Sequence, residues 1–460
     1  MIDISSHGHE IAAAIRDGKV SAIQVLQQFL ARIDAVNGQL GAFTAITAER
    51  ARAKAAAIDT ARGRGGDLGA LAGVPFAVKN LFDIAGLATL AGSKINRQAK
   101  PAQQDATLIQ RLEAAGAILV GGLNMGEYAY DFTGENAHYG PSRNPHDPTR
   151  MSGGSSGGSG TAVAGGMVPL SLGSDTNGSI RVPSSLCGLF GLKPTFGRLS
   201  RHGSYPFVSS LDHLGPLARS TRDLALSYDA MQGPDPFDPV CAQRPKEATI
   251  PHLEAGIAGL RIAVLDGYFA EGAEPEALAA VAAFAKALGT ERRVQIAEAA
   301  AGRAAAYVIT NIEGANLHRQ RLRERPMDFD PDTRDRFLAG LLLPGEWYAQ
   351  AQRFRRHYCA QLNELFRDVD ILLAPATPCS APKLGQKMMT LGGVELPVRA
   401  NLGLYTQPIS FAGLPVVAAP YTEGALPIGV QIIAAPWRED LALRVGRYLE
   451  QSGVAASRLP

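Results

Sequence analysis

The sequence predicts one large α/β domain. Segments with the composition of buried strands alternate with segments of helical periodicity, which is typical of a layered sheet covered by helices. The chain has 460 residues, 46% of them hydrophobic, which is enough for one large core. Neither an internal repeat nor a low-complexity linker divides it. Charged residues make up 19% and the net charge is +2, so no global charge favours nucleic acid or a membrane surface, and no direct nucleic-acid or membrane contact is expected.

Residues 1–60 predict a helical N-terminal layer. Ser21 followed by Gln24 forms a capping-box pattern at the start of a helix, and Gly38 is expected to end it. Apolar residues follow one stripe of this helix: Ala22, Leu26, Phe29, Ile33 and Val36. The stripe predicts that the helix packs on the core, with any contact to another protein chain nearby.

The next elements predict the sheet and its covering helices. Residues 74–78 and 117–120 are strand-like, and residues 105–115 between them have helical period. Beyond residue 220 the pattern continues with expected strands at 260–265, 371–373 and 430–433, and expected helices at 275–288, 303–325, 345–368 and 439–450.

Residues 121–215 form a different kind of segment. They are rich in Gly, Ser, Asn and Pro and have little periodicity, and the whole chain holds 50 glycines and 29 prolines. A structureless segment of this length inside a compact domain is normally functional. Two stretches stand out in it, MSGGSSGGSG at 151–160 and GSDTNGSIRVP at 173–183.

Three interpretations of these stretches compete with a catalytic one. A phosphate-binding loop would need a terminal Lys or a preceding strand, and neither is evident. Residues 153–157 match the GxSxG nucleophile elbow with Ser155 at its centre, but no preceding strand or distinctive downstream His is recognisable. A flexible linker should separate two cores, whereas apolar sequence lies close on both sides.

The fourth interpretation is acyl transfer by serines without histidine. Ser179 directly follows Thr176, Asn177 and Gly178, where a glycine lets successive N–H groups converge, so residues 176–179 are the expected oxyanion hole. Ser155 would carry the proton. The base would be Lys79, at the end of the apolar strand 74–78, because burial lowers the pKa of a lysine and leaves it neutral.

These residues belong to long motifs that resemble the amidase signature family. The matching stretches are GVPFAVKN (73–80), SGGSSGGSG (152–160), GSDTNGSIRVPSSLCGLFGLKPTFGRLSR (173–201) and SLDHLGP (210–216), with later echoes at 370–378, 412–415 and 427–433. The resemblance implies one amidase domain over 1–460, with its signature core at 70–220 and a mixed sheet sandwiched between helices. It also implies Ser179 as nucleophile, Ser155 as a second serine held by a cis peptide, and Lys79 as base.

Within the family, three stretches are similar to the hydrolases that act on 1-carboxybiuret in cyanuric acid degradation: 210–220, 229–242 and 401–420. This resemblance implies a small ureido or amide substrate, release of ammonia, and a small helical partner similar to the C subunit of tRNA-dependent amidotransferases, in a homodimer or heterotetramer. Two alternatives remain open: the glutamine-hydrolysing component of such an amidotransferase, and an inactive scaffold that binds a small helical protein.

One position departs from the family pattern, and the substrate-binding residues are less specific. The family usually has Gly where this chain has Asn177, a residue that tolerates positive φ but whose side chain would narrow the pocket and favour a small polar substrate. A ureido carboxylate needs a cation, for which His318, Arg319 and Arg321 are candidates. Tyr130 is a candidate wall residue by family analogy. Arg181, Asp175 and Asp212 are expected to be structural.

No cofactor is expected from the sequence. His7 and His9 resemble a metal pair, but nothing supplies the remaining ligands, so no metal site is predicted. Four cysteines without CxxC spacing favour a reducing cytoplasm. Neither a signal peptide nor a transmembrane run is recognisable.

Overall fold

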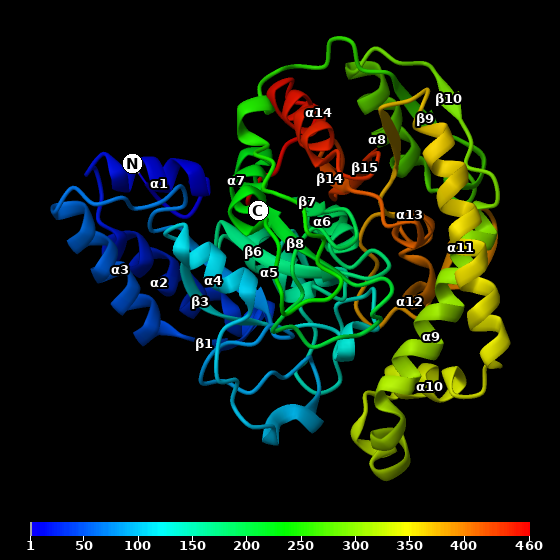
Figure 1. Cartoon of the computed structure of the whole chain (residues 1–460), viewed down its shortest axis with the longest axis horizontal. Helices are drawn as coiled ribbons and strands as arrows, with labels where there is room; N and C mark the ends of the chain where they lie inside the picture. Colours follow the sequence, from blue (N-terminus) through cyan, green and yellow to red (C-terminus); the bar gives the residue numbers. More distant parts are fainter. Residues whose placement is uncertain (1) are drawn as a thin grey trace.

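The computed structural model describes residues 2–460 and has a single-domain α/β fold built on one sheet of eleven strands (Figure 1). Parallel and antiparallel neighbours both occur, so the sheet is mixed, as predicted. Across the sheet the strands run in the order β1 (Phe43–Ile46), β3 (Ile118–Leu123), β2 (Pro75–Lys79), β6 (Leu170–Asp175), β8 (His213–Ala218), β7 (Phe190–Lys193), β14 (Val416–Tyr421), β15 (Ile428–Ala434), β11 (Ile371–Pro375), β9 (Ile262–Leu265) and β10 (Arg293–Val294).

Two small hairpin sheets lie outside the main sheet. They pair β4 (Arg143–Asn144) with β5 (Asp147–Met151), and β12 (Met388–Leu391) with β13 (Val394–Pro397).

Helices cover the sheet along its whole width. They are α1 (Gly8–Arg16), α2 (Ala22–Leu40), α3 (Ala48–Gly63), α4 (Thr107–Ala114), α5 (Gly157–Ala164), α6 (Arg181–Cys187), α7 (Thr221–Met231), α8 (Pro275–Ala287), α9 (Ala299–Glu324), α10 (Pro331–Gly340), α11 (Gly345–Leu365), α12 (Val398–Asn401), α13 (Gln407–Ala412) and α14 (Glu439–Gln451). Short 3₁₀ turns lie at Lys94–Gln98, Glu127–Ala129, Ile250–His252, Gly267–Phe269 and Pro326–Asp328. Helices α5 and α6 contact each other against the middle of the sheet, and α9 packs on α10, α11 and α13 beyond one end of it (Figure 1).

The predicted N-terminal helix is α2, and its start is confirmed. Ser21 accepts from the amide of Gln24, whose side chain bonds back to Ser21. The predicted end at Gly38 is wrong, because the helix continues to Leu40. Gly41 ends it with φ +65°, and a side chain there would meet the carbonyl oxygen of Pro141 at 2.6 Å.

The apolar stripe of α2 packs on the core, as predicted. Ala22, Leu26, Phe29 and Ile33 are buried and Val36 is half-buried against the same core.

The expectation of a structureless segment at 121–215 is wrong. This segment contains β4 to β7, α5, α6 and the start of β8, and every residue from 151 to 195 is buried. Its elements are short and packed on all sides, so neither helical nor strand alternation was visible in the sequence. The strand that the nucleophile-elbow interpretation lacked also exists: β5 ends at Met151, four residues before Ser155.

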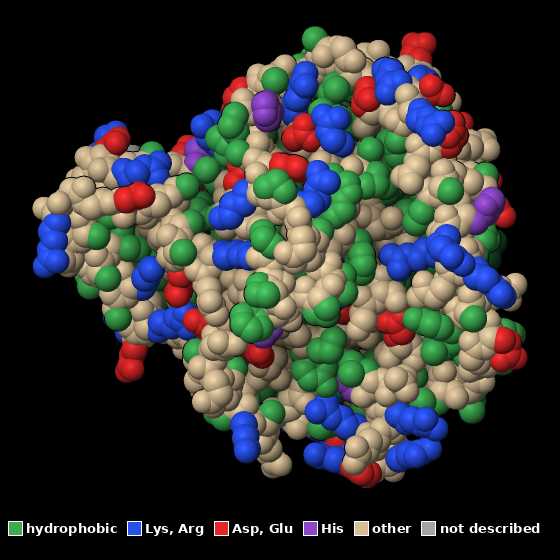
Figure 2. Space-filling view, in the orientation of Figure 1, with side chains coloured by type: hydrophobic (Ala, Val, Ile, Leu, Met, Phe, Trp, Pro, Cys, Tyr) green, Lys and Arg blue, Asp and Glu red, His purple; other side chains and the backbone are tan. Residues whose placement is uncertain are grey.

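The surface mixes both signs of charge over the face shown in Figure 2. Among the residues that the structure describes, none of the helices is long and apolar enough to cross a membrane.

Candidate active site

Lys79 is the last residue of β2, and its side chain is completely buried. Its Nζ atom lies 2.7 Å from Ser155 Oγ, 2.8 Å from Ser174 Oγ and 3.1 Å from Ser156 Oγ. Three hydroxyl groups therefore surround the amine where a carboxylate would normally pair with a buried lysine.

Burial lowers the pKa of Lys79 to about 7, although the carboxylates of Asp175, Asp212 and Asp131 act in the opposite direction. A buried amine loses its hydration, and hydroxyl groups compensate a full positive charge less well than a carboxylate does. Near neutral pH a large fraction of Lys79 is consequently unprotonated and able to accept a proton.

Ser155 lies just before α5, in the turn that leads from β5. The peptide bond between Gly154 and Ser155 is cis, as the family resemblance implied. The amide of Gly154 donates to the carbonyl of Phe132, and the carbonyl of Ser155 accepts from the amide of Gly126. Both neighbours of the serine are thus fixed by backbone hydrogen bonds, which hold its hydroxyl against Lys79.

Ser179 lies in the loop between β6 and α6, and an ion pair beneath the loop fixes its shape. Asp175 and Arg181 are both fully buried and pair at 2.9 Å, and Asp175 also accepts from the amide of Ile180 at 3.2 Å. Arg181 further donates to the carbonyl of Thr406 and to Gln431. Arg181 therefore serves the fold of the loop and does not face the pocket, which agrees with the structural role predicted for it.

The backbone amides of the same loop are available as donors. Within residues 2–460, the amides of residues 176–179 donate to no protein acceptor. Gly178 has φ +143°, and a side chain there would collide with the side chain of Thr406, so only glycine fits this turn. A loop of unpaired amides next to a serine can bind an oxyanion.

Asn177 does not use the conformation expected of it. Positive φ in non-glycine residues occurs elsewhere in the described chain, and Asn177 does not have it. Its side chain does line the pocket, as predicted, and is 7% exposed.

The pocket at Ser179 is narrow, with a volume of about 10 Å³, room for one water-sized sphere. Ten of its lining residues are buried, namely Ala129, Tyr130, Asp131, Phe132, Thr176, Asn177, Ser179, Phe207, Thr310 and Gln407. The other two are Tyr307, which is 41% exposed, and Arg336, which is half-buried. These two side chains are the part of the wall that can move to admit a substrate.

Of the predicted substrate-binding residues, the structure brings Tyr130 to this pocket and leaves His318 and Arg319 outside its lining. His318 is fully buried in an aromatic cluster, 3.9 Å from the ring of Tyr128, and burial lowers its pKa to about 3. A neutral imidazole cannot neutralise a carboxylate. Arg319 is exposed on the next position of α9.

Arg321 is also engaged elsewhere, donating to the hydroxyls of Tyr205 and Tyr128.

The cation at the pocket is Arg336 of α10, which sequence reasoning missed. Its guanidinium carbon lies 3.6 Å from the centre of the Tyr130 ring, and one nitrogen donates to the carbonyl of Tyr130 at 3.0 Å. It stands in a helix with Arg334 and Asp335 nearby in sequence, so nothing in the sequence distinguishes it from a surface arginine.

The histidines considered as alternative bases are not placed for that role. His213 is buried, its Nδ1 lies 2.6 Å from the carbonyl of Leu211, and burial holds its pKa well below the usual range. His202 contacts Gln104. Neither lines the pocket at Ser179.

Asp212 connects the loops around the site. It accepts from the hydroxyl of Thr176 and from the amides of Phe207 and Val208, and burial raises its pKa.

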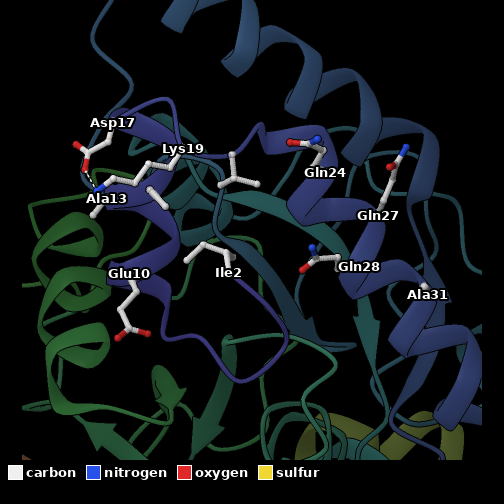
Figure 3. A pocket seen from close by; sticks show the side chains of 11 residues that line it. Ile2, Glu10, Ala13, Asp17, Lys19, Gln24, Gln27, Gln28 and Ala31 are labelled. Atoms are coloured by element: carbon white, nitrogen blue, oxygen red, sulfur yellow. Dashed lines mark hydrogen bonds and ion pairs between the residues drawn. The ribbon is translucent and has the colours of Figure 1, made fainter.

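A much larger cavity, of about 950 Å³, lies between α1 and α2 (Figure 3). Its polar side chains include Glu10, three glutamines, and Lys19, which pairs with Asp17 at 2.8 Å. It holds no serine, cysteine or histidine that could act as a nucleophile. Size alone therefore does not locate the chemistry of this protein.

The fold and the site define an amide-bond hydrolase. The chain belongs to the amidase signature family: the model of the family described as Amidase matches residues 24–443. It is 60% identical to AtzE, the 1-carboxybiuret hydrolase subunit of Pseudomonas sp. (strain ADP), over 97% of this chain and 98% of that protein. It is 36% identical to the corresponding component of the Glutamyl-tRNA(Gln) amidotransferase of Koribacter versatilis (strain Ellin345), over 95% and 96%.

Solved structures agree with this assignment. One, described as "An unexpected vestigial protein complex reveals the evolutionary origins of an s-triazine catabolic enzyme", superposes with a TM-score of 0.98 at 59% identity, covering 98% of this chain and 100% of that chain. The structure of 6-aminohexanoate cyclic dimer hydrolase complexed with substrate gives 0.88 at 28% identity, covering 100% and 99%. The predicted fold class and the prediction of an amidohydrolase are confirmed.

Proposed function

We propose that this protein hydrolyses the C–N bond of a small polar ureido or amide substrate similar to 1-carboxybiuret, with release of ammonia. The observation that carries the proposal is the contact of 2.7 Å between the buried amine of Lys79 and the hydroxyl of Ser155, in the same site as Ser179. A neutral amine in contact with a hydroxyl group is a base and proton carrier that needs no histidine.

The steps follow from this arrangement. Ser179 Oγ attacks the amide carbon, while its proton passes to Ser155 and the proton of Ser155 passes to Lys79. The amides of residues 176–179 hold the tetrahedral oxyanion. The proton returns through Ser155 to the leaving nitrogen, ammonia departs, and water hydrolyses the acyl-enzyme by the same route.

Two observations support a small anionic substrate. The pocket is narrow and buried on most sides, which disfavours a wide acyl group. Arg336 provides a guanidinium group at its rim, suited to a carboxylate. The relative named 1-carboxybiuret hydrolase, with nearly full-length coverage, supports the same class.

An ammonia-release screen tests the proposal. Purified protein is assayed with biuret-like ureido acids, simple amides and glutamine, beside Ser179→Ala. We expect ammonia from ureido acids and none from the variant, and we expect an organophosphorus acylation mimic to label Ser179, located by peptide mapping. Labelling of Ser155 or Ser156 instead would overturn the assignment of the nucleophile.

The alternatives are outcomes of the same screen. Ammonia from glutamine only in the presence of RNA-bound partners would identify the glutamine-hydrolysing component of an amidotransferase, the class of several relatives. A protein without activity that still binds a small helical protein would be a scaffold. The presence of Lys79, Ser155 and Ser179 in one buried site favours an active enzyme.

We also propose that the protein works in an assembly, as a homodimer or as a heterotetramer with a small helical partner similar to the C subunit of amidotransferases. The neighbouring solved structure described as a protein complex supports this. Light scattering on the protein, alone and with a small co-encoded helical protein, is the test; a strict monomer in both samples would exclude the assembly.

A further inference from the structure

The side chain of Asn177 carries a buried acceptor without a partner. Its Nδ2 atom donates to Thr310 Oγ1 at 2.9 Å, and its Oδ1 atom is fully buried and receives no hydrogen bond within residues 2–460. Buried acceptors are almost always paired, so an unpaired one in a pocket wall requires an explanation. The simplest explanation is a donor that the substrate brings.

The amide group is fixed in this orientation from two sides. Thr310 is 1% exposed and holds the nitrogen end of the amide. Thr406 Oγ1 donates to the main-chain carbonyl of Asn177 at 2.7 Å, which fixes the backbone from which the side chain projects. A preorganised acceptor of this kind discriminates between ligands more strongly than a mobile one.

The position of Asn177 indicates which part of the substrate it meets. The leaving nitrogen must lie toward Ser155, which returns the proton, and neither Ser155 nor Lys79 is among the residues lining the narrow pocket. Asn177 lines it together with Ser179, Tyr130 and Arg336. The pocket therefore receives the acyl part of the substrate, between the reacting carbonyl at Ser179 and the cation of Arg336.

We propose that Asn177 Oδ1 accepts a hydrogen bond from the N–H group on the acyl side of the scissile carbonyl, so that Asn177 selects ureido substrates over carboxamides. In a ureido compound the atom on that side is a nitrogen with a hydrogen, whereas in a carboxamide it is a carbon. The inference rests on the function proposed above and names the substrate class of the same site.

The test uses two substrates that differ only at this atom. Ureidoacetate and succinamate have the same length, the same carboxylate and the same terminal amide, with NH in one where the other has CH₂. We expect the wild-type protein to release ammonia from ureidoacetate with a kcat/KM at least about tenfold above that for succinamate, since the missing donor leaves a buried acceptor unpaired. Asn177→Leu, of similar size and without an acceptor, should bring the ratio close to one.

A second variant separates hydrogen bonding from the shape of the pocket. Thr310→Val keeps the volume and removes the acceptor that orients the amide of Asn177, so we expect it to lower the same ratio by about threefold or more. Thermal unfolding of both variants checks that they fold. A ratio that Asn177→Leu leaves unchanged overturns the inference, and so does a wild-type protein without preference.

The readouts also distinguish this inference from the proposed function. If wild-type protein acts on neither isostere while the organophosphorus mimic labels Ser179, the selection by Asn177 is wrong and the catalytic assignment stands. If Ser179 is not labelled and Ser179→Ala keeps its ammonia release, the proposed function fails, whatever the ratio.

Discussion

The two sides of the pocket at Ser179 are built in opposite ways. The side that carries Ser155 and Ser179 belongs to residues 151–195, all of which are buried, and is fixed by the ion pair of Asp175 with Arg181. The opposite wall comes from the amphipathic helices α9 and α10, and its Tyr307 and Arg336 reach solvent. Fixed geometry serves the bond-breaking groups, whereas the wall that admits and recognises the substrate keeps freedom to move.

The largest expected effect breaks the fixed side. Lys79→Arg should lower kcat/KM by at least about 10⁴-fold, because a guanidinium group cannot give up its proton in this pH range and the proton route loses its base. Lys79→Ala should be equally inactive. Ammonia release measures both, and circular dichroism with thermal unfolding checks the fold.

A structural lysine would behave differently, since arginine often preserves a structural charge. If Lys79→Arg kept a tenth of wild-type turnover, Lys79 would not be the base.

The second prediction concerns the pH dependence of the same side. The folded-state pKa of Lys79 is about 7, below that of a free lysine, so the amine is neutral above this pH and gains a proton below it. Activity should therefore fall on the acid side, with kcat/KM decreasing about tenfold per unit below pH 7. A profile flat from pH 5 to 8 in buffers of constant ionic strength would contradict a lysine base.

The third prediction addresses the mobile wall. Arg336→Met should raise KM for an anionic ureido acid about 10- to 100-fold, since hydrogen bonds to a charged group contribute about 1.5–3 kcal/mol, and should change kcat much less. A neutral amide of similar size is the matched control, with KM expected within about twofold of wild type. An equal loss for both substrates would show that Arg336 supports the fold of the wall instead of the substrate.

This contrast also explains what could be predicted from the sequence. Lys79, Ser155 and Ser179 were recognisable because the chemistry requires unusual local sequence, such as glycine at 178, where a side chain would meet Thr406. The mixed sheet and long helices were predictable from periodicity and family resemblance. Arg336 was missed and His318 misassigned because both lie in ordinary helical sequence, and only tertiary packing determines which helix position reaches the pocket.

Fold details failed where a distant contact decides the outcome. Gly38 and Gly41 are equivalent as helix ends in the sequence. The carbonyl of Pro141, a hundred residues away, leaves room only for a glycine at 41. Similarly, residues 121–215 lacked periodicity because their short elements are buried on every side.

The smallest expected effect lies far from both sides of the pocket, at the N-cap of α2. Ser21→Ala removes the acceptor for the amide of Gln24, which should lower the stability of the helix by about 1 kcal/mol. Because α2 packs on the core through Phe29 and Ile33, the loss should appear in global unfolding, as a decrease of about one degree in Tm. The matched control is Ser21→Asp, which keeps an acceptor at the N-cap and should keep the wild-type Tm. Neither variant should change kcat or KM, since Ser21 is not among the residues lining the pocket at Ser179. An altered KM in Ser21→Ala would show that the N-terminal layer transmits its state to the active site, and would remove the sharp separation between the fixed side, the mobile wall and the rest of the fold.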